Sequence, residues 1–138
     1  MKEIVDTCVW SLSLRRRDKT RINANEQQML AQFREAIQDR RAVIIGPIRQ
    51  EILSGIRDQA QFAKAEELLD PFRDEEVTTA DYVDAARLFN LCQDHGVQCG
   101  PVDILLCAVA VRKHYAILTY DQGLKRCMEV LRSEGLTR

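Results

Sequence analysis

Four acidic residues stand at positions from which their carboxylates can act together. Asp6 and Asp121 each follow a short apolar segment, whereas Glu51 and Asp103 lie near the starts of two apolar-faced helical segments. Taken singly, each has a local explanation, as a helix N-cap or as a partner of the helix dipole. Helices that follow parallel strands, however, begin at one common edge of the sheet, where α/β proteins bind ligands. We therefore expect the four carboxylates to converge.

Such a convergence has a direct chemical consequence. Two unit charges about 4 Å apart repel by several kcal/mol at intermediate dielectric, so a cation must neutralise the group or its members must share protons. Ligands that are all oxygen select a hard cation, Mg²⁺ or Mn²⁺, rather than zinc. A dication held in this way activates water and polarises a phosphoryl group. The sequence thus favours metal-assisted hydrolysis of a phosphodiester.

The elements that would position these acids alternate along the chain. Lys2–Asp6, Ala42–Ile45 and Tyr115–Thr119 are typical of buried strands, and Glu75–Thr78 of a weak edge strand. The expected helices are Thr7–Arg17, Ala24–Arg40, one beginning at Pro47, Asp58–Leu69, Thr79–His95, Val102–His114 and Lys125–Glu134. On the fifth of these, the residues expected to face inward are Tyr82, Ala85, Ala86 and Phe89. This alternation predicts an α/β fold with right-handed crossovers and helices on both faces of a parallel sheet.

Composition narrows the class of protein. The 138 residues suit a single domain, 1–138, and the 46% apolar and 30% charged residues argue against disorder. A net charge of -1 gives no global field that would mark a binder of nucleic acid or membranes. No run approaches the ~18 apolar residues of a membrane span. No signal peptide is recognised, so we expect a cytoplasmic protein.

Five cysteines are present, an odd number that fits free thiols in a reducing cytosol better than a disulfide framework. Cys92, His95 and Cys99 are spaced closely enough to suggest zinc, but no fourth ligand is evident. We interpret them as helix-end thiols and a surface histidine. Cys8 and Cys107 lie in apolar helical stretches, where core positions are expected.

The acidic segments also resemble those of a known family. IVDTCVW, PIRQEILSG, GPVDILLCAVAV and AILTYD look like the four acidic motifs of PIN-domain proteins, and most resemble the VapC-type toxins of bacterial toxin–antitoxin pairs. The resemblance covers nearly the whole chain, in order. It implies a three-layer α/β/α sandwich around a parallel sheet of strand order 3-2-1-4-5.

The same resemblance implies a metal-dependent endoribonuclease. Asp6, Glu51, Asp103 and Asp121 would bind Mg²⁺ or Mn²⁺ and position the attacking water. Thr7 and Thr119 would hydrogen-bond those carboxylates. Many relatives carry a further acid and an aromatic residue after the fourth acid, where this chain has Gln122-Gly123-Leu124, so no fifth carboxylate is expected. The implied partners are an RNA substrate, with tRNA and rRNA as candidates, a cognate antitoxin and a second copy of the chain.

The basic segment RRRDKTR and the tryptophan can each be interpreted in two ways. The segment RRRDKTR supplies Arg15, Arg16, Arg17, Lys19 and Arg21, which suit either phosphate contacts beside the site or a solvated helix C-terminus. The single tryptophan, Trp10, suits either the core or a homodimer interface.

Two other functions remain in competition. A PIN-like scaffold would hold RNA or a protein without cutting, with Asp121 pointing away and no metal bound. A receiver-type domain would accept phosphate on its central aspartate, but it needs an acidic pair after the first strand and a lysine after the last. Because Asp6 is alone and Asp121 stands in the place of that lysine, we rank the receiver interpretation last.

Overall fold

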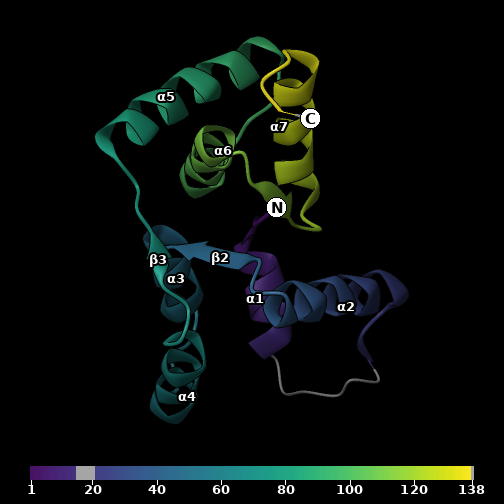
Figure 1. The fold of residues 1–138 in the computed structure, drawn as a ribbon, viewed down its shortest axis with the longest axis vertical. Coiled ribbons are helices and arrows are strands. Elements are labelled where there is room, and N and C mark those ends of the chain that lie inside the picture. Colours follow the sequence, from purple (N-terminus) through teal and green to yellow (C-terminus); the bar gives the residue numbers. More distant parts are fainter. Residues whose placement is uncertain (15–20, 138) are drawn as a thin grey trace.

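A parallel sheet forms the middle of the molecule (Figure 1). The computed structural model describes residues 1–14 and 21–137. Its strands are β1 (Glu3–Val5), β2 (Ala42–Ile45), β3 (Asp74–Glu75) and β4 (Ala116–Leu118). They stand in the order β3-β2-β1-β4, so β1 is hydrogen-bonded on both sides. The first strand of the chain is therefore the central one.

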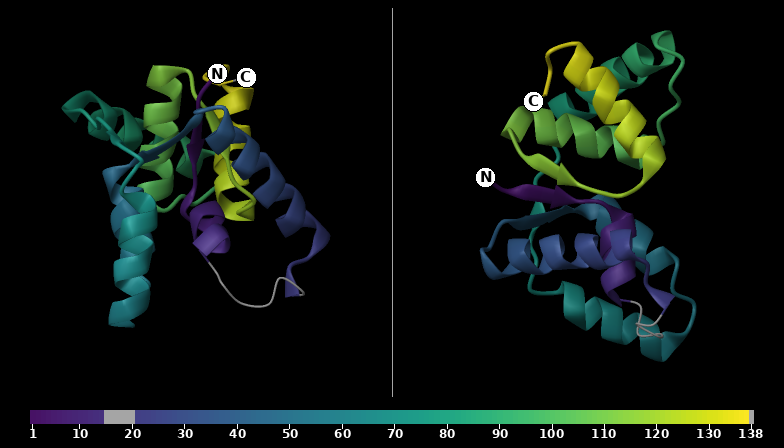
Figure 2. Two further views of the ribbon diagram at one scale, coloured as in Figure 1. Left: turned by 60° about the horizontal axis from the view of Figure 1, so that its bottom comes forward. Right: turned by 90° about the vertical axis from the view of Figure 1, so that its right-hand side faces the viewer.

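Helices cover both faces of this sheet. Their bounds are α1 (Thr7–Leu14), α2 (Ala24–Gln38), α3 (Gly46–Ser54), α4 (Gln59–Leu69), α5 (Thr79–Asp94), α6 (Pro101–Lys113) and α7 (Gln122–Ser133). Helices α1 to α4 lie on one side and α5 to α7 on the other (Figure 2). This arrangement confirms the expected α/β class with a parallel sheet. Within the described ranges, no helix combines the length and the apolar character needed to cross a bilayer.

The core fills both layers because the central strand is apolar on both of its faces. Ile4 and Val5 are completely buried. Trp10 packs edge-on against Phe33 and Phe72, with ring centroids 4.9 Å apart in both pairs, and its Nε1 donates to the carbonyl of Val5. Trp10 is thus a core residue, which decides between the two interpretations of this side chain.

Local signals set the helix starts on which the acids depend. Pro47 lies in the first turn of α3, and Pro101 begins α6, where a missing N–H costs no helical hydrogen bond. His114 ends α6 in the left-handed region, with φ of 57°. The chain then turns at once into β4, so α6 and β4 are joined without a long loop.

The strand order differs from that implied by the resemblance. In the described part of the chain the sheet has four strands in the order 3-2-1-4, and the implied fifth strand is not among them. After β4 the chain runs directly into α7, and turns follow α7. The edge strand is also shorter than Glu75–Thr78, because Thr78 caps α5 instead of extending the strand.

Two helical expectations also need correction. On α5 the buried residues are Asp81, Ala85, Leu88 and Cys92, whereas Tyr82 is 56% exposed. The expectation holds for Ala85 and for Phe89, which packs against the core, and it is wrong for Tyr82 and Ala86, because the inward stripe begins with the charged residue Asp81. The last helix begins at Gln122 and not at Lys125, because Asp121 caps it by accepting a hydrogen bond from the N–H of Leu124.

The charged residue on the inward face of α5 is neutralised by α6. Asp81 is completely buried, and Arg112 donates to it from Nε at 2.5 Å and from Nη2 at 2.8 Å. The N–H of Thr78 donates to the same carboxylate at 2.8 Å. The Arg112 guanidinium, followed by the Thr78 amide, holds the pKa of Asp81 below its ordinary value despite burial. The pair thus ties α5 to α6.

Replacing Asp81 with Asn should lower the free energy of unfolding by about 2 kcal/mol, because Arg112 loses a charged acceptor that is itself completely buried. Urea denaturation at pH 7 measures the change. The pKa of Asp81 is lower in the folded protein than in the unfolded chain. The extra stability of the wild type is therefore complete above the unfolded pKa of about 3.9, and it is lost as the pH falls through the folded pKa. The control is Asp84→Asn on the same helix, whose exposed pair with Arg87 is worth less than about 0.5 kcal/mol. Equal effects of the two variants would contradict this account.

Candidate functional site

The four acids come from four elements that meet at the carboxyl edge of the sheet. Asp6 directly follows β1, and its N–H donates to the carbonyl of Leu118 in β4 at 3.0 Å. Glu51 lies on α3, which directly follows β2, and Asp121 caps α7 just beyond β4. Asp103 lies in the first turn of α6. The order of the strands places Asp6 in the middle of this group.

Asp6 is held by hydrogen bonds at both oxygens and is only 4% exposed. Its Oδ1 accepts from the N–H of Thr7 at 2.8 Å, and its Oδ2 accepts from the hydroxyl of Thr119 at 2.8 Å. The same Thr119 hydroxyl accepts from the N–H of Asp121 at 3.0 Å. One buried threonine therefore connects the central carboxylate to the backbone of a second acid.

A second threonine connects the other side of the site. The hydroxyl of Thr7 donates to Oε1 of Glu51 at 2.6 Å, which joins the start of α1 to α3. Glu51 is otherwise exposed, so this bond restricts a side chain that solvent would leave free. Both threonines that the resemblance singles out thus hydrogen-bond an acid of the group.

The pKa of Asp103 is affected by the other three carboxylates. Burial, followed by the negative charges of Asp6, Asp121 and Glu51, raises its pKa to about 6. Across residues 1–14 and 21–137, no hydrogen-bond donor contacts the Asp103 carboxylate, and no Lys, Arg or His forms an ion pair with any of the four acids. The group carries negative charge that the described protein does not neutralise.

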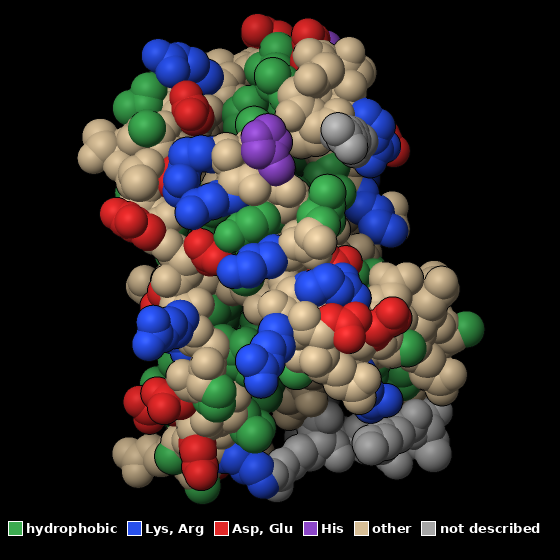
Figure 3. Space-filling model, in the orientation of Figure 1, with side chains coloured by type: hydrophobic (Ala, Val, Ile, Leu, Met, Phe, Trp, Pro, Cys, Tyr) green, Lys and Arg blue, Asp and Glu red, His purple; other side chains and the backbone are tan. Residues whose placement is uncertain are grey.

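On the face drawn in Figure 3, charges of opposite sign are mixed. Figure 3 shows one face, on which Lys and Arg side chains are spread among Asp and Glu. At the starts of the strands, for example, Arg41 pairs with Glu3 at 2.6 Å. The uncompensated acids at the carboxyl edge differ from this general pattern.

The donor set fits a hard dication, although the oxygens do not form a closed shell. Among the described residues, no three of the carboxylates bring oxygens within 4.8 Å of one another. Mg²⁺ commonly keeps several waters and takes only one or two carboxylates directly, so an open arrangement suits it. One oxygen of Asp121 is already used as the cap of α7, and the local explanation for this residue therefore holds alongside the metal interpretation.

Cys8 is a site residue that the sequence did not indicate. The expectation of a core position is confirmed for Cys107, which is completely buried, whereas Cys8 is half-buried at the edge of the core. Its Sγ lies 3.2 Å from Oδ2 of Asp6 and 3.5 Å from Oγ1 of Thr119. Burial is the main cause that raises its pKa to about 11, so it is a neutral thiol at pH 7. Its only sequence signal is its place two residues after Asp6.

A pocket of about 650 Å³ adjoins the site. Its walls come from α1, α3 and α4, and Glu51 is one of its lining residues. On α4 the pocket is bordered by Lys64 and by Leu68, which is 51% exposed. An apolar surface therefore lies directly beside the acidic group.

The basic segment remains a prediction. Arg15, Arg16, Arg17 and Lys19 lie outside the described residues, and Arg21 is exposed at the start of the next described range.

Two of the cysteines form a disulfide that their spacing in the sequence does not predict. Cys99 and Cys127 form a disulfide with a Cα–Cα distance of 6.4 Å, so the expectation of free thiols is wrong for this pair. Cys92 is buried beside them, and the sulfurs of the three residues lie within 4.8 Å of one another. His95 pairs with Glu134 at 3.1 Å and is exposed, as expected for a surface histidine. The cysteines meet because α7 packs beside the end of α5, a contact that spacing along the chain cannot reveal.

Comparison with known proteins yields one family. A family model described as PIN domain matches residues 4–129, which is most of the chain. No curated protein matches the sequence.

The raised pKa of Asp103 predicts how metal-free protein responds to pH. Because the unfolded carboxyl ionises near 3.9 and the folded one near 6, stability from this group is full below about pH 4 and is lost as the pH rises through about 6. Asp103→Asn should remove this loss and be more stable than wild type at pH 8 by about 1–2 kcal/mol. Urea denaturation in the presence of a chelator measures it. Glu67→Gln, at an exposed position on α4, should keep the wild-type slope, and a wild-type slope in Asp103→Asn would refute the assignment.

Proposed function

The chain belongs to the PIN-domain family, whose members are generally nucleases, and from this premise we propose that it is a metal-dependent endoribonuclease. The observation that carries the proposal is the group of four acids that the described part of the protein leaves without a cation. A folded protein can keep four carboxylates close together at little cost in stability when a bound cation neutralises their charge.

Asp6, Glu51, Asp103 and Asp121 would hold Mg²⁺ or Mn²⁺. When bound, such an ion lowers the pKa of a water molecule and polarises a phosphoryl oxygen. Thr119 and Cys8 keep Oδ2 of Asp6 in place, and Thr7 orients Glu51. In the proposed reaction water attacks the phosphate in line and leaves a 5′-phosphate and a 3′-hydroxyl.

RNA would reach the acids through electrostatic contacts around them. Removing the four acids from the count leaves the rest of the chain at -1 + 4 = +3, and Arg15, Arg16, Arg17, Lys19 and Arg21 are close together in the sequence. Cations placed in this way contact phosphates and provide affinity with little selectivity for sequence. We propose that this segment binds the RNA backbone, with tRNA or rRNA as the substrate.

We further propose that the protein is the toxin of a type II toxin–antitoxin pair and acts as a homodimer. The pocket between α1, α3 and α4 supports an inhibitory partner, because it is largely apolar and includes Glu51. An antitoxin segment seated there would place an arginine among the acids and supply the cation that they lack.

A second candidate function is a PIN-like module that binds RNA or protein without cutting. It is favoured by two observations. Within the described ranges no three carboxylates bring oxygens within 4.8 Å of one another, and one Asp121 oxygen is used as a helix cap.

The nuclease proposal predicts that Asp6→Asn cleaves RNA at least about 100-fold more slowly than wild type in the presence of Mn²⁺, because the central carboxylate loses its charge. Cleavage of a mixed RNA pool, followed on denaturing gels, measures the rate, and chelation of Mn²⁺ should abolish it in the wild type. Glu129→Gln, an exposed change on α7, is the matched control. Equal cleavage by wild type and Asp6→Asn would exclude the proposal and leave the binding module.

The toxin proposal predicts that expression of the wild-type chain arrests bacterial growth. Arrest should be absent with Asp6→Asn at equal protein level, and it should be relieved when the product of a neighbouring gene is expressed together with the wild type. Growth curves with immunoblots for protein level measure both effects. Unimpaired growth with an RNA-cleaving protein would separate the nuclease from the toxin role.

A further inference from the structure

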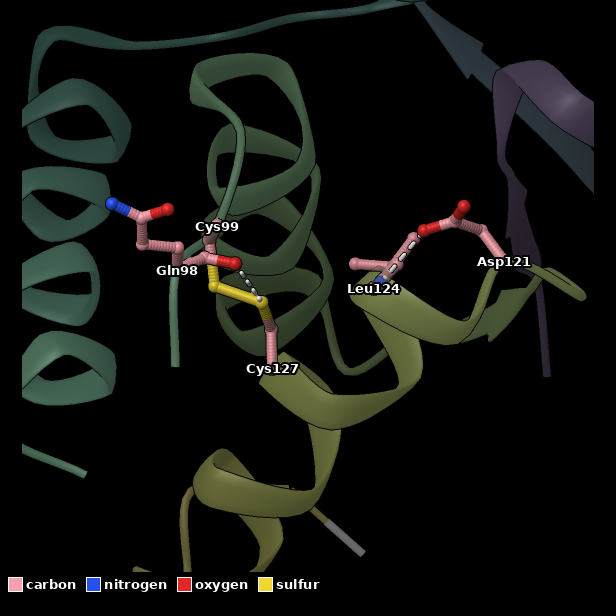
Figure 4. Close-up of a disulfide and its surroundings, with 5 residues drawn as sticks. All are labelled: Gln98, Cys99, Asp121, Leu124 and Cys127. Atoms are coloured by element: carbon pink, nitrogen blue, oxygen red, sulfur yellow. Dashed lines mark hydrogen bonds between the residues drawn. A yellow bond between two sulfur atoms is a disulfide. The ribbon is translucent and has the colours of Figure 1, made fainter. Parts of the chain in front are cut away.

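Three cysteines from separate segments form a buried group that the proposed reaction does not use. Cys92 lies near the end of α5, Cys99 lies in the loop before α6, and Cys127 lies on α7. Their sulfurs lie within 4.8 Å of one another, and Cys99 is bonded to Cys127 (Figure 4). Cys92 remains a free thiol at the side of the bond.

The bond joins the two segments that carry Asp103 and Asp121. Cys99 directly precedes Gly100, and the Asp103 carboxylate lies so near this glycine that a Cβ on it would be 3.4 Å from Oδ2. Cys127 lies one turn after Leu124, whose N–H donates to Asp121 at 2.8 Å (Figure 4). Each end of the disulfide is therefore within one helical turn of the backbone that holds an acid.

Neither of these two acids has the hydrogen bonds that hold Asp6 at both oxygens. In the described chain, Asp103 accepts no hydrogen bond and Asp121 is held by the amide of its own helix. Asp103 at the start of α6 and Asp121 at the start of α7 carry like charges when both are ionised, so they repel each other. Their separation therefore depends on how firmly the start of α6 is tied to α7.

We propose that the Cys99–Cys127 bond is a reversible redox switch that fixes the start of α6 against α7 and thereby sets the spacing of Asp103 and Asp121. The inference rests on the proposed function, in which these acids hold a dication. The bond links two residues that are 28 positions apart in the sequence, and opening it removes this constraint on the chain between them. The repulsion between the carboxylates then moves them apart. Reduction should weaken metal binding, and oxidation should restore it.

The chemistry is thiol–disulfide exchange with a dithiol reductant. One thiolate of the reductant attacks Sγ of Cys99, which is in the loop, and Cys127 leaves as a thiolate that takes up a proton. The second thiol of the reductant then displaces Cys99, which also gains a proton. The protein bond accepts two electrons, and the reductant leaves as its own disulfide.

The test compares the oxidised full-length chain with the same protein treated with a phosphine, which passes two electrons to the disulfide and takes its oxygen from water. Mn²⁺ affinity, followed by the electron paramagnetic resonance of free Mn²⁺, should fall about fivefold or more on reduction. Hydrogen exchange should become faster at the amides of Ile104 and Leu124, which close the first turns of α6 and α7.

Two variants distinguish the bond from the cysteines themselves. Cys99→Ser should behave like reduced protein with or without the phosphine. Cys92→Ser removes a cysteine of the same cluster that is not in the bond, and it should respond to reduction as wild type does.

Three results would overturn the switch. The bond resists the phosphine in the folded protein, as read from intact mass after thiol labelling; or it opens without changing Mn²⁺ affinity and amide exchange; or the reduced cluster takes up Zn²⁺ and is a metal centre. The proposed function fails separately. If neither redox state cleaves RNA or binds Mn²⁺ while amide exchange at Ile104 and Leu124 still responds to reduction, the nuclease proposal is wrong and the bond still controls the helix junction.

Discussion

Repulsion among four carboxylates at one edge of the sheet is the constraint on which the rest of the structure depends. The protein reduces it only in part. Backbone N–H groups at helix starts contact Asp6 and Asp121, where the helix dipole favours negative charge. Asp103 has no such contact with the described residues and instead binds a proton more tightly, with a pKa of about 6. The site is therefore suited to a cation, whereas the buried carboxylate of Asp81 is already compensated by Arg112.

The central position of β1 in the sheet determines where Asp6 lies. A strand that is paired on both sides and covered on both faces cannot move easily, so Asp6 is delivered to a fixed point. Thr7 and Thr119 extend that fixed point to Glu51 and to the backbone of Asp121. Much of the geometry thus depends on two hydroxyl groups that stand beside the ends of β1 and β4.

The two halves of the site are held by different means. Hydrogen-bonded threonines hold Asp6 and Glu51, whereas helix packing and the Cys99–Cys127 bond hold the segments of Asp103 and Asp121. A covalent link of this kind can be made and broken without unfolding the sheet. The apolar pocket lies on the other side, beside Glu51. Chemistry, partner binding and redox control would accordingly act on different residues of one small edge.

The sequence by itself determined the features that depend on neighbouring residues. Apolar runs identify β1, β2 and β4, prolines 47 and 101 mark two helix starts, and the order of the four acidic segments indicates the PIN family that the family model then matches. Only the tertiary structure decided which sulfurs meet, that Cys8 contacts Thr119, that Asp81 turns inward and that the described sheet has four strands. Each of these depends on packing between separate elements, such as α7 against α5 or α6 against Asp81. Spacing along a single chain carries no information about which distant side chain fills a given gap.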